Sequence, residues 1–237
     1  MLRPEEIKAC LREHSRFREK YVSDDCLLSF TSYYGRVKAT MTVEEFTKDK
    51  NFKSFMPCRE GFLKAINESN KFSYNKKSCK FLEIGVYKGR NALRIYNEFS
   101  PNLFWLIDPN NIAKESAKKI LDPFSDKNCK FITDFSHNVA NRFEDEYFNF
   151  IYFDGGHTYE ECERDLRLYY PKLKKGGVMS GHDFTCNRRS MMKKSYGTQK
   201  AICELLTQYK KKLQFATVAP ETEKPNKILP TDWAFIK

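Results

Sequence analysis

The sequence predicts an α/β protein built around a mainly parallel sheet, and three observations support this prediction. From Cys79 onward, short apolar stretches alternate with segments of helical periodicity. Such alternation is typical of βαβ units, in which helices cover both faces of a parallel sheet. An acidic residue stands at the end of each of the first five apolar stretches. The residues before Cys79 carry few strand signals, so we expect an N-terminal helical cap at residues 1–78 and an α/β domain at residues 79–237.

The expected cap contains three helix signals. A proline near the start, acids in the first turn and apolar residues at nearly helical spacing mark the stretch PEEIKACLREHSRFREKYV. Glu45 follows Thr42 by three residues in TVEEFTKDKNF, which is the capping-box pattern. A third helix is expected in CREGFLKAINESNKF, and residues 74–78 would link the cap to the α/β domain.

The expected strands of the second part are, in chain order, KFLEI, LFWLID, CKFIT, FNFIYFD and GGVMSGHD. Helices are expected between them at Gly89–Phe99, Ala113–Leu121, Ser136–Phe143 and Tyr159–Tyr170. Another helix in TQKAICELLTQYKKK precedes two closing strands, LQFATVA and DWAFIK, which a proline-containing turn connects.

Composition indicates a globular cytoplasmic protein. Hydrophobic residues make up 41% of the 237 residues and aromatic residues 15%, which suits a chain with a buried core. No apolar run approaches the roughly 20 residues that span a bilayer, and the charged N-terminus lacks the apolar segment of an export signal. The eight cysteines include no Cys-x-x-Cys pair, so we expect reduced, mostly buried thiols rather than a zinc or redox site.

The formal net charge of +11 leaves nucleic acid, an acidic membrane and an anionic small molecule open as partners. Lysine and arginine are spread thinly, however, with clusters only at residues 172–175, 188–194 and 210–212. No aromatic RNA-binding signature accompanies these clusters. Nucleic acid is therefore disfavoured, and solvated surface charge is the simpler explanation of the excess.

Acidic residues at the strand ends indicate a binding site. The carboxyl ends of parallel strands meet at one edge of a sheet, where ligands bind near the point at which the strand order reverses. A carboxylate is costly to bury without a partner, so acids gathered there should line a shared polar cleft. These acids are Glu83, Asp108, Asp134, Asp154 and Asp183.

The stretch FLEIGVYKGR carries the glycines of a cofactor loop or of an ordinary strand-to-helix turn. Asp108 lies roughly 20 residues beyond Gly89, where a Rossmann-type site holds ribose hydroxyls, so an adenosine-containing ligand is favoured. Tyr87 stands where a dinucleotide site needs its middle glycine for the pyrophosphate. S-adenosylmethionine has no phosphate, and its ammonium and sulfonium suit the nearby acids, so the loop favours this methyl donor.

Taken together, these stretches of the second part resemble class I S-adenosylmethionine-dependent methyltransferases. The likeness spans about residues 79–237 and is most specific in Asp154–Glu160 and Gly176–Asp183. These two stretches resemble a branch that includes macrolide-sugar O-methyltransferases. The resemblance implies a Rossmann-like, seven-stranded, mainly parallel sheet whose last two strands form an antiparallel hairpin. It does not extend to the first 78 residues.

The resemblance also implies which residues bind the cofactor. Residues at the ends of the first four strands would each contact one part of S-adenosylmethionine. Glu83 would bind the methionine portion together with the loop residues Gly85, Val86, Tyr87 and Gly89. Asp108 would bind the ribose hydroxyls. The adenine would lie beside Asp134 and Phe135, and the transferring methyl beside Asp154.

Several relatives bind a divalent cation through the acid after the fourth strand and an acidic pair after the fifth. Asp154 and Asp183 match the outer positions, while His182 stands where such relatives often carry a carboxylate. Mg²⁺ prefers oxygen ligands, so this departure leaves the use of Mg²⁺ or another divalent cation open. A metal held by these three residues would grip two substrate oxygens and lower the pKa of the attacked hydroxyl.

His157, three residues after Asp154, is the expected general base, with Asp154 and His182 as further catalytic candidates. The alternative is that His157 caps the following helix or binds a backbone carbonyl. The loop at residues 184–197 follows Asp183 directly. It either closes over the acceptor, with its basic residues facing an anionic group, or is a basic surface loop.

We therefore expect methyl transfer from S-adenosylmethionine to a hydroxyl oxygen of a small molecule. The helical cap would supply walls of the acceptor site and a homodimer contact. Three alternatives remain: N-methylation of a small amine or nucleobase, methylation of nucleic acid, and a cofactor-binding, scaffold or hydroxylase-like protein that transfers no methyl group.

Overall fold

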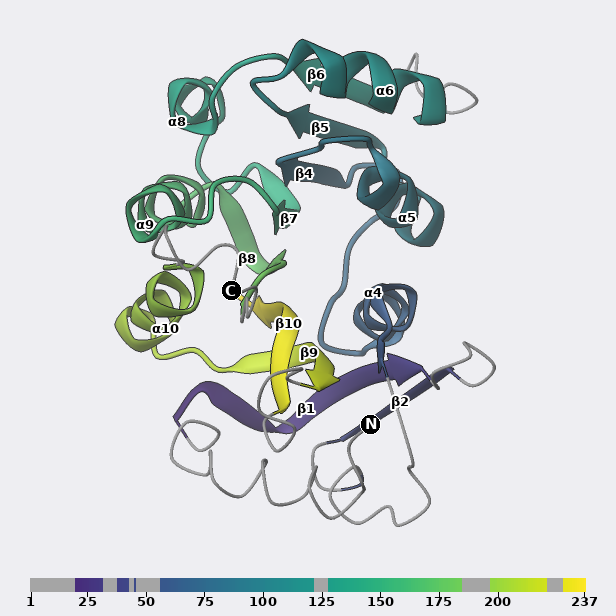
Figure 1. Cartoon of the computed structure of the whole chain (residues 1–237), viewed down its shortest axis with the longest axis vertical. Helices are drawn as coiled ribbons and strands as arrows, with labels where there is room; N and C mark the ends of the chain where they lie inside the picture. The colour runs from purple at the N-terminus through teal and green to yellow at the C-terminus, as the bar shows by residue number, and fades with distance from the viewer. Residues whose placement is uncertain are drawn as a thin grey trace.

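A computed structural model of the chain describes residues 20–31, 38–42, 45, 56–121, 128–184, 197–220 and 228–237. Ten strands in these residues form one sheet in the order β2-β1-β9-β10-β8-β7-β4-β5-β6, with β3 paired to β1 (Figure 1). The strands are β1 (Val22–Thr31), β2 (Lys38–Thr42), β3 (Met56–Pro57), β4 (Lys80–Ile84), β5 (Leu103–Ile107), β6 (Cys129–Ile132), β7 (Phe148–Phe153), β8 (Leu173–Gly181), β9 (Leu213–Pro220) and β10 (Ile228–Ile236).

The strands β4 to β8 are all parallel, and the strand order reverses between β4 and β7. From β4 the chain winds outward through β5 and β6, then returns to β7 beside β4 and continues to β8. The final strand β10 runs antiparallel to both β8 and β9, which gives the expected closing hairpin. The crevice above the carboxyl ends of β4 and β7 is therefore the place where a ligand is expected.

Helices cover both faces of the sheet (Figure 1). One face carries α4, α5 and α6 and the other carries α8, α9 and α10, so the α/β expectation for the second part is confirmed. Their bounds are α4 (Arg59–Glu68), α5 (Arg90–Phe99), α6 (Asn111–Leu121), α8 (Ser136–Val139) continued by the 3₁₀ turn η1 (Ala140–Arg142), α9 (Tyr159–Tyr169) and α10 (Thr198–Gln208).

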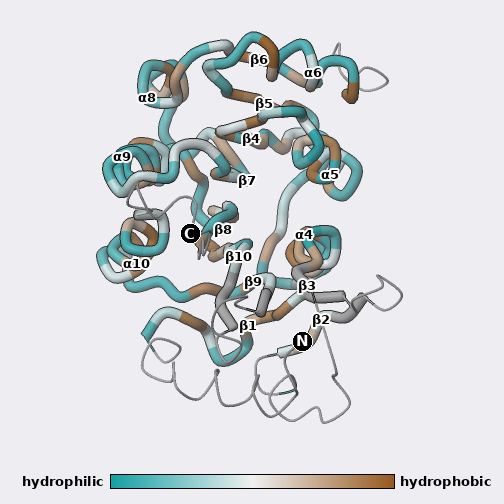
Figure 2. The backbone as a smooth tube through the Cα atoms, in the orientation of Figure 1, coloured by the Kyte–Doolittle hydropathy of each residue, from teal (hydrophilic) through white to brown (hydrophobic). Residues whose placement is uncertain are grey.

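The core consists of two apolar layers, one on each face of the central strands. Neighbouring residues of one strand enter different layers because side chains alternate along a strand, as with Phe81 and Leu82 in β4. Phe81 packs on Phe99 and Phe150, with ring centroids 5.3 and 5.0 Å away. Hydrophobic residues accordingly concentrate along the strands and the inward turns of the helices (Figure 2). A well-packed sheet of this kind gives the strand ends fixed positions.

The expectation that the first 78 residues are helical is wrong for β1, β2 and β3. β1 pairs parallel with β9 and antiparallel with β2, so this part of the chain extends the sheet from the expected seven strands to ten. The alternation that would have predicted β1 is interrupted by Asp24 and Asp25, and the pairing register shifts between Val22 and Leu27. Such a bulge inserts residues that pair with nothing, and it disguises the strand in the sequence.

The helix expected in CREGFLKAINESNKF is confirmed as α4. The Thr42–Glu45 capping box is also present, because Glu45 N–H donates to Thr42 Oγ1 at 3.1 Å and Thr42 N–H donates to Glu45 Oε2 at 2.7 Å. Most of the helix expected at residues 4–22 and of the basic loop at 184–197 lies outside the described residues. No helix in the described part of the chain is long and apolar enough to cross a membrane.

Candidate active site

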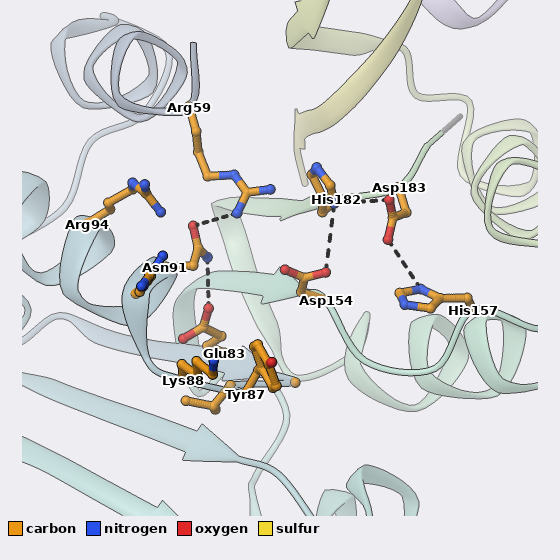
Figure 3. A pocket seen from close by; sticks show the side chains of 13 residues that line it. Arg59, Glu83, Tyr87, Lys88, Asn91, Arg94, Asp154, His157, His182 and Asp183 are labelled. Atoms are coloured by element: carbon orange, nitrogen blue, oxygen red, sulfur yellow. Dashed lines mark hydrogen bonds and ion pairs between the residues drawn. The ribbon is translucent and has the colours of Figure 1, made fainter. Parts of the chain in front are cut away.

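A cavity of about 670 Å³ opens at the carboxyl ends of β4, β7 and β8 (Figure 3). A second cavity of about 330 Å³ adjoins it and shares Gly85, Tyr87 and Asp154 with it. The first contains Glu83 and the Asp154–His182–Asp183 cluster, and the second contains Asp108 and Phe135. The fold thus brings most of the residues singled out in the sequence to one continuous hollow.

The glycine loop after β4 has a shape that only glycine permits at two positions. Gly85 has φ +84°, and a Cβ there would lie 2.1 Å from the carbonyl oxygen of Asp154. Gly89 has φ +74°, and its Cβ would lie 2.7 Å from the Cα of Ala117 in α6. Both glycines therefore permit close backbone contacts. Tyr87, between them, has φ +48° and a side chain that is 71% exposed at the rim of both cavities.

Asp108 holds this loop in place. Its Oδ2 accepts the backbone N–H groups of Val86 and Tyr87, both at 2.9 Å, and its Oδ1 accepts that of Asn110 at 2.9 Å. An ionised carboxylate can accept about four hydrogen bonds, so Asp108 retains acceptor capacity for ribose hydroxyls. The residue expected to bind ribose is thus also the residue that shapes the loop.

Asp134, expected beside the adenine, engages neighbouring polar groups of its own chain segment. It is absent from the lining of both cavities, and its Oδ1 accepts from Phe135 N–H at 2.7 Å and from Asn138 Nδ2 at 2.8 Å. These bonds satisfy donors at the start of α8. Phe135 does line the smaller cavity, with 57% of its side chain exposed, so it offers a face for a planar ring.

Glu83 is the most strongly perturbed acid of the site. It is fully buried, and its Oε1 accepts from Asn91 Nδ2 at 2.7 Å. Its Oε2 is buried with no hydrogen-bond partner among the described residues. Burial raises the pKa of Glu83 to about 8, against the opposing effect of the Asn91 hydrogen bond. A buried carboxylate oxygen at a cavity wall requires a donor, and a ligand ammonium would supply one.

Asp154, His182 and Asp183 form a cluster at the carboxyl ends of β7 and β8. One ligand atom from each residue lies within 4.8 Å of the other two. His182 Nδ1 lies 3.1 Å from Asp183 Oδ1 and 3.9 Å from Asp154 Oδ1. Two carboxylates and one imidazole suit a divalent cation such as Mn²⁺, Fe²⁺ or Zn²⁺ at least as well as Mg²⁺. The residues expected to bind a metal are therefore placed together.

Electrostatic effects within this cluster favour a charged pair. Burial raises the pKa of Asp154, although His182 and Arg59 act in the opposite direction. Burial lowers the pKa of His182, but the hydrogen bond to Asp183 and the negative charges of Asp232 and Asp183 together outweigh it, and the net shift is upward. Burial raises the pKa of Asp183, but the hydrogen bond and charge of His182, together with the charges of His157 and Arg59, outweigh it and the net shift is downward. In the metal-free protein His182 and Asp183 thus stabilise each other as an ion pair.

His157 lies at the edge of the larger cavity, with Nδ1 3.5 Å from Asp183 Oδ2 (Figure 3). Its side chain does not cap the following helix. Thr158 is the N-cap of α9, and it forms a reciprocal capping box with Glu161. The alternative role considered for His157 as a helix cap is therefore excluded, and its imidazole remains beside the acidic cluster.

Three functional candidates were missed in the sequence. Arg59 lines the larger cavity, donates to Asp232 Oδ1 at 2.8 Å and contacts Asn91 Oδ1 at 3.3 Å. Asn91 carried a usable signal, because it is a polar residue on the buried face of α5 with Ala92 and Ile95. Arg59 and Asp232 carried no signal in the sequence, because they stand far apart along the chain and belong to no motif.

Comparison with known proteins gives matches to methyltransferases. Residues 82–184 match the family model described as a methyltransferase domain. None of the curated proteins matches the chain in sequence.

Solved structures share the fold at low sequence identity. The N-methyltransferase NodS from Bradyrhizobium japonicum has a TM-score of 0.54 and 13% identity, over 76% of this chain and 95% of that chain. A ribosomal RNA methylase from Streptococcus thermophilus has a TM-score of 0.53 and 12% identity, over 76% and 93% of the two chains. A methyltransferase from Podospora anserina, solved with S-adenosylhomocysteine bound, has a TM-score of 0.52 and 13% identity, over 76% and 78%.

Proposed function

We propose that this chain, which has a Rossmann-like fold and whose residues 82–184 match a methyltransferase-domain model, transfers a methyl group from S-adenosylmethionine to a hydroxyl oxygen of a small molecule. One observation carries the proposal. A buried, unpartnered oxygen of Glu83 and the Asp154–His182–Asp183 cluster line the same cavity. The first suits the ammonium of the cofactor, and the second suits an acceptor hydroxyl.

The two adjoining cavities fit the two ends of the cofactor. We place its adenosine in the smaller cavity, with the ribose at Asp108 and the adenine beside Phe135. Its methionine portion would then pass the glycine loop and reach Glu83 in the larger cavity. The sulfonium of the bound cofactor supplies the methyl group. Asp154 belongs to both cavities and would therefore border the transfer point.

His157 is proposed as the general base. Its imidazole would accept the proton of the acceptor hydroxyl as the oxygen attacks the methyl carbon, and Asp183 Oδ2 would orient the ring from 3.5 Å. Attack must be in line with the breaking bond, with the reacting atoms about 3–3.5 Å apart. The lining residues Lys88 and Arg90 make an acceptor with an anionic group the better fit to the same cavity.

Replacement of His157 by glutamine should lower methyl transfer to a hydroxyl acceptor by roughly 100-fold, because general bases contribute typically 10²–10⁴-fold. Affinity for S-adenosylhomocysteine should stay within twofold, since His157 lies away from Glu83 and Asp108. Transfer of labelled methyl to a panel of hydroxyl and amine acceptors measures the first effect, and calorimetry measures the second. Unchanged transfer to a hydroxyl acceptor would exclude His157 as the base.

Asp154, His182 and Asp183 are proposed to hold a divalent cation, which would supply Lewis-acid chemistry that lowers the pKa of the attacked hydroxyl. Calorimetry with S-adenosylhomocysteine, in Mn²⁺, in Mg²⁺ and in EDTA, tests cofactor and metal separately. We expect micromolar binding of S-adenosylhomocysteine in all three buffers, and direct binding of Mn²⁺ that Asp183→Asn weakens at least tenfold.

Different results contradict different parts of the proposal. Absence of any S-adenosylhomocysteine binding would overturn the methyltransferase assignment. Cofactor binding without Mn²⁺ binding would remove only the metal. Methyl transfer to an amine that survives both EDTA and His157→Gln would favour the N-methyltransferase alternative, because a neutral amine needs neither a metal nor a strong base to attack.

A further inference from the structure

Arg59 lies outside the matched methyltransferase domain, yet its guanidinium is fixed at the edge of the cavity. It is the first residue of α4, and its Nε donates to Asp232 Oδ1 on β10 at 2.8 Å. Asp232 is 1% exposed, and it also accepts the hydroxyl groups of Tyr152 and Thr217, both at 2.8 Å. Because the guanidinium is a rigid plane, fixing Nε also fixes where its other N–H groups point.

The fixed guanidinium determines how Asn91 is oriented. Arg59 Nη1 contacts Asn91 Oδ1 at 3.3 Å, and Asn91 Nδ2 donates to Glu83 Oε1 at 2.7 Å (Figure 3). A guanidinium only donates hydrogen bonds, so Asn91 must turn its amide oxygen toward Arg59. The amide NH₂ group then faces Glu83, whose Oε1 can accept from it whether or not Glu83 carries a proton. Arg59 selects the orientation in which the amide NH₂ group faces Glu83.

This orientation leaves one oxygen of Glu83 for a ligand. Asn91 engages Oε1, and Oε2 stays buried without a hydrogen-bond partner among the described residues. We propose that Arg59 is a positioning residue of the cofactor site, which acts through Asn91 to present Glu83 Oε2 to the ammonium of the cofactor's methionine portion. This inference rests on the proposed function. It assigns part of the cofactor site to the chain segment before the matched domain.

Two ligands separate a positioning role from a purely structural one. S-adenosylhomocysteine carries the amino-acid portion, whereas 5′-methylthioadenosine has the same adenosine and sulfur without it. Only the first can contact Glu83 through an ammonium. A residue that positions Glu83 should therefore affect the first ligand alone, while a residue that merely supports the fold should affect both.

The experiment measures both ligands by calorimetry in three full-length variants. Asn91→Leu removes the amide that links Arg59 to Glu83 but leaves the Arg59–Asp232 ion pair intact. Arg59→Met together with Asp232→Asn removes both charges of the pair, so that no buried carboxylate is left unpaired. Lys172→Met is the control, because the Lys172 side chain is about as buried as that of Arg59, forms an ion pair with Asp145 at 2.8 Å and lines neither cavity.

We expect Asn91→Leu and the double variant to weaken S-adenosylhomocysteine binding about tenfold, since hydrogen bonds to charged groups are lost. Both should bind 5′-methylthioadenosine within twofold of the wild type, and Lys172→Met should change neither ligand. Equal weakening of both ligands, or no weakening of either, would overturn the positioning role while leaving the methyltransferase assignment intact. Failure of the wild type to bind either ligand would overturn both.

Discussion

Glu83→Gln should remove most of the affinity for the cofactor and, at the same time, make the ligand-free protein more stable. The loss of affinity follows from the loss of a buried negative charge opposite the ligand ammonium. Truncating one partner of a buried, hydrogen-bonded charge pair costs about 2–5 kcal/mol. Glutamine keeps the side-chain length and an oxygen for Asn91, so we expect the lower end, roughly 30- to 100-fold weaker binding of S-adenosylhomocysteine.

The gain in stability follows from the pKa of Glu83. The value of about 8 in the folded protein lies above the ordinary value of 4.5, because burial disfavours the charged form. An acid with a raised pKa favours the folded state below pH 4.5, and this advantage is lost as the pH rises from 4.5 to 8. At pH 7 the difference corresponds to about 3 kcal/mol. Glutamine does not ionise, so it avoids this loss.

Thermal unfolding of wild type and Glu83→Gln between pH 4 and pH 8 measures the effect. The variant should unfold roughly 5–10 °C higher at pH 7, and the difference should shrink toward zero near pH 4, where Glu83 is protonated in both states. The acidic end of the series is thus an internal control. Binding of S-adenosylhomocysteine by the variant within threefold of the wild type would contradict the proposed contact. A variant that is less stable at pH 7 would contradict the buried, unpaired state of Glu83.

The part of the site that the sequence predicted consists of the residues fixed by topology. A parallel sheet brings strand ends together, so Glu83, Asp108, Asp154 and Asp183 could be placed at one edge without knowledge of their contacts. The contacts themselves could not be predicted. Asp108 binds the backbone of the glycine loop, and Asp134 binds donors at the start of α8, because short-range geometry decides which donors a carboxylate meets.

The part of the site that the sequence did not predict depends on long-range pairing. Arg59 reaches Asp232 across 173 residues of sequence, and neither residue belongs to a pattern with a known period. β1 was missed for a related reason, because two adjacent aspartates interrupt its alternation and only the pairing with β9 reveals it as a strand. The N-terminal part therefore differs from the helical cap expected of it: it extends the sheet and contributes Arg59 to the cavity.

Gly85→Ala should destabilise the protein far more than an ordinary glycine substitution, because two separate costs coincide there. The first is conformational, since φ +84° is unfavourable for a residue with a Cβ and costs about 1–2 kcal/mol. The second is steric, because the new Cβ would lie 2.1 Å from the carbonyl oxygen of Asp154. Neither side can move freely: Gly85 N–H bonds to Ile107 O at 2.9 Å, and Asp154 N–H bonds to Ile84 O at 2.8 Å.

Gly176→Ala separates these two costs. Gly176 has φ +75°, close to that of Gly85, but a Cβ there would meet nothing within 4 Å. The control should therefore lose only the conformational part of the free energy of unfolding, about 1 kcal/mol. Gly85→Ala should lose at least about 4 kcal/mol, which is an exceptionally large loss for a single substitution. Urea unfolding of both variants measures the two losses. Equal losses in the two variants would show that β4 and β7 can separate at their carboxyl ends. The site would then lack the rigid floor on which the positions of Glu83 and Asp154, and hence the alignment of cofactor and acceptor, depend.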